Sequence, residues 1–146
     1  MHIEAFRDYC LSKQGVTEEF PFDHDTLTFK VMGKIFAMAD VERFESINLK
    51  CDPELVPVLR EQYPAVQPGY HMNKKHWNTV LVDGSVSDRL LQEWIDHSYD
   101  LVVSGLTRKQ IRMNNGARFG TNTASNCNIQ HMRSPFHLFQ FPGFGR

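Results

Sequence analysis

Residues 70–79 (YHMNKKHWNT) hold the side chains that are best suited to contact another molecule. They include two aromatic rings, two imidazoles, two adjacent lysines and two carboxamides, and they follow a Pro68-Gly69 pair that is typical of a turn. Fixed cations, amide groups and aromatic faces together suit phosphate and base recognition better than packing in a core. The segment is therefore predicted to be an exposed binding surface.

Within this segment, Lys74 and Lys75 are the expected phosphate contacts of a nucleic-acid-binding protein. Supporting cations on predicted outward faces and at a strand turn are Lys30, Lys34 and Lys50. Hydrogen bonds to the ligand would come from His71, Asn73, His76 and Asn78. Trp77 either stacks on a base or sugar or anchors the rim of the core, and a tryptophan that opens a strand favours the anchor. For the lysines, the alternative is an ordinary solvated face.

The charge distribution limits how such a surface can be built. The chain has 146 residues, enough for one domain, and a formal net charge of -1. All 17 acidic residues lie at or before Asp100, so residues 1–111 carry 12 basic groups against 17 acidic ones. Because non-specific DNA binding requires a basic surface, the cations of this acidic domain must be concentrated locally.

Composition also bears on the compartment. No apolar run approaches the roughly 20 residues of a membrane span, and the N-terminal residues lack the pattern of a secretory signal. Cys10, Cys51 and Cys127 are odd in number and without metal-type spacing, which favours reduced thiols over disulfides. We expect a cytoplasmic protein.

Hydrophobic periodicity predicts helices around an antiparallel sheet. Residues 2–14 place Ile3, Phe6 and Cys10 on one helical stripe. Alternation predicts strands at residues 26–32, 35–40, 46–51 and 77–82, with a tight reversal at Gly33-Lys34 between the first two.

Two more helices are predicted from capping signals. Asp52 followed by Pro53 predicts a helix to about Gln62, in which Pro57 distorts the first turn. Residues 85–88 resemble a capping box, and the following helix sets its apolar residues on one face. We expect this face to bury Leu91, Trp94 and Ile95 against Phe29, Val31, Ile47 and Leu49.

Beyond Met113 neither structural period continues, and the sequence becomes rich in asparagine, glycine and phenylalanine. The predicted domain is therefore residues 1–113, followed by an extension at residues 114–146. Disorder is the first interpretation of this extension. Docking of its phenylalanines on the domain or on a partner is the second, and an end produced by an altered reading frame or by cloning is the third.

Several blocks in order resemble the MmcQ/YjbR family of small bacterial proteins. They are FPFD at residues 20–23, TFKV at 28–31, GKIFA at 33–37, NLKCDP at 48–53, PGYHMNKKHWN at 68–78 and DHSYDLV at 96–102. The resemblance covers about residues 4–109. It implies an α+β fold like that of frataxin/CyaY, a two-layer arrangement in which N- and C-terminal helices cover an antiparallel sheet. It also implies DNA binding, because family members are described as binding DNA through a double-wing motif.

Other classes of function have weaker support. His71 and His76 lack the spacing of a metal site, and the first predicted helix offers only Glu4 and Asp8, so no metal is expected. No phosphate loop or nucleophile motif occurs. We therefore expect a DNA-binding or regulatory protein without catalysis or cofactor. The alternative is a small interaction module that binds a protein or an anionic small molecule through residues 70–78.

The pair His97-Ser98 near Asp96 and Asp100 contains the residue types of a catalytic triad. Neighbours on a helix point in different directions, and Ser98 falls on the predicted apolar face. Ser98 and Tyr99 are therefore interpreted as structural.

Overall fold

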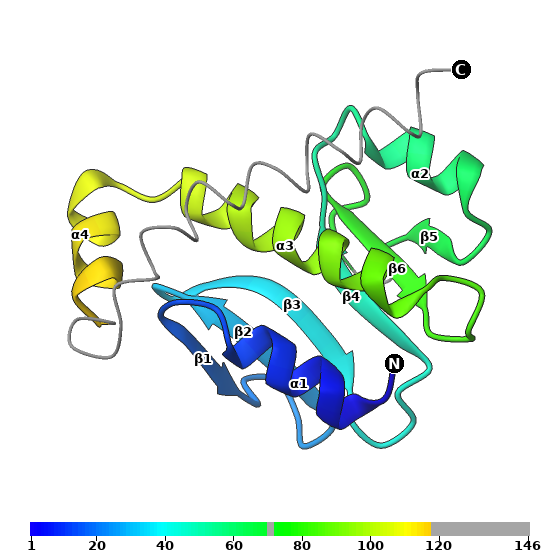
Figure 1. Ribbon diagram of the computed structural model, residues 1–146, viewed down its shortest axis with the longest axis horizontal. Helices are drawn as coiled ribbons and strands as arrows, with labels where there is room; N and C mark the ends of the chain where they lie inside the picture. The colour runs from blue at the N-terminus through cyan, green and yellow to red at the C-terminus, as the bar shows by residue number, and fades with distance from the viewer. Residues whose placement is uncertain (70–71, 118–146) are drawn as a thin grey trace.

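A computed structural model describes residues 1–69 and 72–117, and within them six strands form one antiparallel sheet beside four helices (Figure 1). The strands are β1 (Val16–Glu19), β2 (Thr26–Val31), β3 (Lys34–Asp40), β4 (Ser46–Lys50), β5 (Val66–Pro68) and β6 (Trp77–Leu81). The helices are α1 (Ile3–Leu11), α2 (Val56–Gln62), α3 (Asp88–Ser104) and α4 (Arg108–Ala117). The spatial order of the strands is β1-β2-β3-β4-β6-β5. The predicted α+β class and the antiparallel sheet are confirmed.

The core lies between the sheet and the helices α1 and α3, which cover one of its faces (Figure 1). The strand residues predicted to face inward are all buried, as are their predicted partners on α3; they are Phe29, Val31, Ile47, Leu49, Leu91, Trp94 and Ile95. Phe6 and Cys10 bury the predicted stripe of α1. Cys10 and Cys51 are buried free thiols, whereas Cys127 lies outside the described residues.

The β2–β3 turn differs from the predicted one by a single residue. Met32 and Gly33 occupy it with φ of 49° and 80°, and Lys34 already belongs to β3. A register shift between Phe29 and Lys30 gives β3 one extra residue, and Phe36 there is fully buried. Bulges of this kind re-aim a side chain, here into the core.

Two strands are absent from the sequence-based prediction. β1 pairs with β2, and β5 pairs with β6, so these two short strands form the edges of the sheet. Strands of four and three residues contain too few positions to show a period of two. Pro68 lies in β5, where an edge strand tolerates the missing N–H group.

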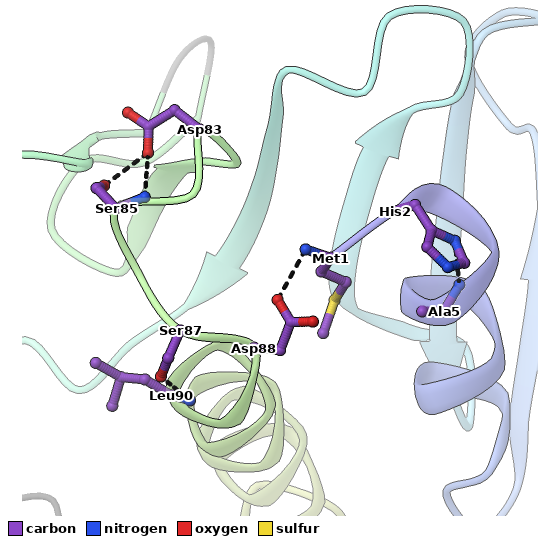
Figure 2. A network of polar contacts seen from close by, with 8 residues as sticks. All are labelled: Met1, His2, Ala5, Asp83, Ser85, Ser87, Asp88 and Leu90. Carbon is purple, nitrogen blue, oxygen red and sulfur yellow. Dashed lines mark hydrogen bonds and ion pairs between the residues drawn. The ribbon is translucent and has the colours of Figure 1, made fainter.

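The starts of two helices need correction. α2 begins at Val56 rather than at Pro53, so Pro57 falls in the first turn, where proline costs little. Ahead of it, Asp52 caps a separate turn by accepting the N–H of Glu54 at 2.8 Å. The N-cap of α3 is Ser87, which accepts the Leu90 N–H at 3.2 Å (Figure 2).

Figure 2 also shows what Ser85, the predicted cap of α3, does instead. Its backbone N–H and its hydroxyl both donate to Asp83 Oδ1, at 2.9 and 2.6 Å. In the same view the α-amino group of Met1 lies 2.8 Å from Asp88 Oδ1, so the starts of α1 and α3 are adjacent.

Among residues 1–69 and 72–117, none of the helices combines the length and the hydropathy of a membrane span.

Helix α4 extends past the predicted domain boundary at Met113. Asn114 is 4% exposed, and the Gln14 side chain donates to its backbone oxygen at 3.0 Å. Gln14 also donates to Asn115 Oδ1 at 2.8 Å. These contacts are polar, so the hydrophobic periodicity of the sequence did not predict them. Residues 118–146, the remainder of the predicted extension, lie outside the described residues.

We expect Leu91→Ala to lower the free energy of unfolding by about 2 to 5 kcal/mol, because it would leave a cavity at a fully buried site. Urea unfolding followed by circular dichroism would measure it. Leu101→Ala, at a partly exposed position of the same helix, should cost less. A loss at Leu91 within about 0.5 kcal/mol, as is usual at surface sites, would contradict the assigned core face.

A pair of glycine variants tests whether α4 docks on the domain. Gly15 and Gly33 both have positive φ, at +73° and +80°, so alanine strains the backbone at either site. A Cβ at Gly15 would also lie 1.6 Å from Asn114 Oδ1, whereas nothing lies within 4 Å at Gly33. Gly15→Ala should therefore lower the melting temperature more than Gly33→Ala does. Equal losses would show that Asn114 does not pack on Gly15.

Candidate functional site

The two adjacent lysines lie on a closed turn between β5 and β6, residues 73–77, which we call the lysine turn. The backbone oxygen of Asn73 accepts N–H groups from His76 at 3.2 Å and from Trp77 at 3.0 Å. Its side-chain oxygen accepts the Lys75 N–H at 2.9 Å. Asn73 therefore closes the turn with both its backbone and its side chain, an arrangement that asparagine favours.

Arg60 of α2 supports the lysine turn. Its Nη2 donates to the backbone oxygens of Lys74 at 2.6 Å and Trp77 at 3.2 Å, and its Nε donates to Asn78 Oδ1 at 2.9 Å. The planar guanidinium thus joins α2 to both ends of the turn. Sequence reasoning missed Arg60, because its partners are 14 to 18 residues away and no local pattern links them.

Gly69 fits the same arrangement. Its N–H donates to the Trp77 oxygen at 3.1 Å, and a Cβ at this position would lie 2.9 Å from both the Cβ and the backbone oxygen of Trp77. A larger residue would push the segment that enters the turn away from β6. The Pro68-Gly69 signal therefore reflects a close backbone approach.

The structure brings six of the ten predicted site residues together. Asn73, Lys74 and Lys75 are exposed on the lysine turn, where His76 and Trp77 are half-buried. Lys50 of β4 lies directly opposite Trp77 in the sheet register. Residues opposite each other on paired strands point to the same face, so the Lys50 side chain lies beside the indole.

Four predicted site residues do not join this group. Asn78 is 2% exposed and accepts from Arg60, so its assignment as a ligand contact is corrected to a structural one. Lys30 forms an ion pair with Glu19 at 2.7 Å. Lys34 lies at the same end of the sheet, beside the β2–β3 turn, but β4 separates it from β6. His71 lies outside the described residues.

Within the described residues, the cations around the lysine turn have no acidic partners. Lys50, Arg60, Lys74 and Lys75 form no ion pair with any carboxylate in residues 1–69 and 72–117. Of the other cations in the described residues, Arg7, Lys13, Lys30 and Arg89 are each paired with an acidic side chain, whereas Lys34, Arg43 and the cations of α4 are not. Positive charge is therefore available to a ligand at this turn, although the domain as a whole is acidic.

A group of five exposed acidic residues lies at the opposite end of the sheet. β4 ends at Lys50 and β6 begins at Trp77, whereas the neighbouring strand β3 ends at Asp40, at the other end of the antiparallel array. The five acidic residues are Asp40, the last residue of β3, and the loop residues Asp23, Asp25, Glu42 and Glu45. An open depression of about 570 Å³ in this region is lined by Asp40, Glu45 and Arg43 among others. Its two carboxylates make it unsuitable for a polyanion.

The predicted structural roles of Ser98 and Tyr99 agree with their contacts. Ser98 Oγ donates to the Phe36 oxygen at 2.5 Å and accepts the Lys50 N–H at 2.9 Å. The Tyr99 hydroxyl donates to the Gln14 oxygen at 2.5 Å.

His97 also has a structural contact. Its Nε2 accepts the Asp52 N–H at 3.2 Å, and burial lowers the pKa of His97 to about 4.

Within the described residues, no group of three His, Cys, Asp or Glu side chains could hold a metal ion.

One cluster of ionisable groups lies between α1 and α3. The Lys13 ammonium pairs with Asp96, which also accepts the Tyr9 hydroxyl at 2.7 Å. Asp100 lies one helical turn beyond Asp96, and its two buried carboxylate oxygens have no hydrogen-bond partner in the described part of the chain. Burial raises the pKa of Asp100 to about 8, Asp96 adds to the rise, and Lys13 opposes it.

Comparison with known proteins identifies relatives of this chain. The model of the YjbR family matches residues 11–101. The Escherichia coli (strain K12) protein YjbR is 35% identical over 114 residues, which cover 77% of this chain and 97% of that protein. YbdF of Escherichia coli O157:H7 is 41% identical over 91 residues, covering 62% and 75% respectively. Both are described as uncharacterized proteins.

A solved structure shows the same fold. It is a crystal structure of a Deinococcus radiodurans protein with a DUF419 domain, 38% identical to this chain. The TM-score is 0.72, and the match covers 78% of this chain and 88% of the other.

The ionisable cluster gives a prediction about pH. A folded-state pKa of about 8, raised from 3.8, means that folding must keep a proton on Asp100 that the unfolded chain has lost at neutral pH. The resulting cost in stability grows as the pH rises from about 4 to about 8. Asp100→Asn removes it, so the variant should gain melting temperature at pH 8 and little at pH 4.

Thermal unfolding of the wild type and the variant across this pH range would measure the effect. Glu93→Gln, which removes a negative charge from the same helix, is the control. A gain for Asp100→Asn that is the same at every pH would show that the Asp100 carboxyl does not titrate in this range.

Proposed function

This chain belongs to the YjbR family, and on that premise we propose that it binds nucleic acid through the lysine turn. The contact surface consists of the exposed Lys74 and Lys75, with Lys50 and Arg60 beside them. The proposed role is binding or regulation without catalysis and without a cofactor.

The observation that carries the proposal is a group of four cations around one turn that have no carboxylate partner in the part of the chain that the structure describes. A nucleic acid gains affinity when Lys and Arg neutralise its phosphates and release counterions. Cations already paired with carboxylates would have to break those pairs first. Lys74 and Lys75 avoid this cost, because neither is paired with an acidic side chain among residues 1–69 and 72–117.

The hydrogen bonds of the turn support the same function. Asn73 and Arg60 hold the backbone that carries the lysines, so less backbone entropy is lost when a phosphate binds. Lys74 Nζ donates to the Gly69 oxygen at 3.2 Å and retains two further donors. Trp77 is half-buried, so both roles predicted for it remain compatible with its position: a base-stacking surface or an anchor at the rim of the core.

The distribution of charge predicts the strength of binding and the orientation of the ligand. The acidic loops at the other end of the sheet repel a polyanion, so it would approach from the lysine turn. With few phosphates neutralised, affinity for an arbitrary duplex should fall in the non-specific range, roughly 10⁻⁴ to 10⁻⁶ M at physiological salt.

A small interaction module is the second candidate function. The acidic balance of residues 1–111 favours it, because few cations remain for a long polyanion. In that case the same surface, residues 70–78, would bind a protein or an anionic small molecule. Salt dependence separates the two candidates, since contacts with many phosphates weaken steeply as salt rises.

We expect Lys74→Ala/Lys75→Ala to weaken binding to all duplex sequences alike. The salt slope, which is the steepness with which the logarithm of the binding constant falls with the logarithm of the salt concentration, should decrease by about two units, near one for each lost phosphate contact. Fluorescence anisotropy of a labelled duplex at about 50 and about 200 mM salt would measure both. The fold should remain intact, because both side chains are exposed.

The matched control is Arg43→Ala/Arg89→Ala, which removes the same charge near the acidic end of the sheet, where both arginines are exposed. It should leave the slope unchanged. If wild-type binding does not depend on salt, or if the lysine variant binds as the wild type does, the lysine turn is not a nucleic-acid surface.

A further inference from the structure

Helix α4 presents a second group of free cations. Arg108, Lys109 and Arg112 are all exposed and form no ion pair within the described residues. The sequence contains no carboxylate after Asp100, so no acidic side chain is near them in the chain. The helix also lies outside residues 11–101, which the family model matches.

The three cations share the outer side of the helix. At about 100° per residue, each lies more than 100° around the axis from Asn114, which is buried against the domain, although Arg108 lies within about 20° of Asn115. Gln14 holds the helix through Asn114 and Asn115, and Asn114 Nδ2 lies 3.5 Å from the Tyr99 hydroxyl. Figure 1 shows α4 at the edge of the molecule, beyond the end of α3.

Helix stability does not account for these charges. The first turn is closed by reciprocal bonds, Gln110 N–H to Thr107 Oγ1 at 3.1 Å and Thr107 N–H to Gln110 Oε1 at 3.0 Å. Arg108 and Lys109 lie in this turn, where positive charge opposes the helix dipole, and no acidic residue offsets them. A helix built only for stability would carry acidic residues there.

We propose that the outer side of α4, formed by Arg108, Lys109 and Arg112, is a second contact surface for the phosphate backbone of duplex nucleic acid. This inference rests on the proposed function of the lysine turn and adds a separate element to it. The partner follows from charge complementarity, because three unpaired cations on one helix side suit a regular array of phosphates. The patch contains no aromatic residue, whereas protein-binding hot spots are enriched in Trp and Tyr as well as Arg.

The test is the variant Arg108→Gln/Lys109→Gln/Arg112→Gln, because glutamine removes charge and keeps helix propensity. Anisotropy of a labelled duplex should show weaker binding and a salt slope lower by about three units. The melting temperature should not fall, because two charges that oppose the helix dipole are gone. Combined with Lys74→Ala/Lys75→Ala, the losses should add.

The single variant Arg112→Gln covers the case in which the triple variant unfolds. Arg112 lies beyond the first turn and contacts no other described side chain through a hydrogen bond or ion pair. It should lower the slope by about one unit with no change in melting temperature. Arg43→Gln, which removes one positive charge from an exposed site after β3, is the control for net charge.

Failure of the inference and failure of the proposed function have different signatures. If the α4 variants bind like the wild type while the lysine-turn variant binds more weakly, the inference is wrong and the proposed function remains. If the wild type shows no salt-dependent DNA binding, the proposed function fails and the inference fails with it. Binding of poly-glutamate as tightly as duplex DNA, lost in the α4 variants, would assign the helix to an acidic protein and overturn the inference.

Discussion

The burial of α3 against the sheet is the interaction on which the rest of the structure depends. Leu91, Trp94 and Ile95 leave water in this interface, and side chains of this size contribute roughly 1.5 to 3 kcal/mol each. The other elements are attached to the same helix by ring contacts, hydrogen bonds and an ion pair. Trp94 contacts Tyr63 after α2, Asp96 contacts Lys13 after α1, Ser98 contacts Lys50 of β4, and Tyr99 contacts Gln14 and Asn114. Both proposed binding surfaces therefore depend on α3 for their positions.

The arrangement of the antiparallel strands explains how an acidic domain can present a cationic surface. Net charge describes the average, whereas a ligand meets the local arrangement within about one Debye length, roughly 8 Å at physiological salt. Antiparallel strands place Lys50 and the lysine turn at one end of the sheet and the acidic loops at the other. Five exposed carboxylates thus lie at the end of the sheet away from the lysine turn.

The lysine turn and α4 are both held in place by polar contacts. Arg60 and Asn73 fix the turn through backbone oxygens and amides, and Gln14 fixes α4 in the same way. Hydrogen bonds of this kind specify one geometry, because they weaken steeply away from their preferred distance and angle. A rigid backbone under mobile lysine and arginine side chains suits contact with phosphates, where charge position matters more than detailed shape.

The sequence by itself determined the elements with strong periods, namely α1, α3 and the strands β2, β3, β4 and β6, together with the family and the exposure of Lys74 and Lys75. Burial of an apolar face leaves a periodic pattern, and such a pattern can be read locally. Only the tertiary structure shows that Asn78 is buried and that Arg60 supports the lysine turn. It also shows that Lys30 is paired with Glu19 and that α4 docks on Gly15. Each of these depends on a polar contact between residues distant in the chain. Such contacts need one donor and one acceptor, so they leave no repeating pattern in the sequence.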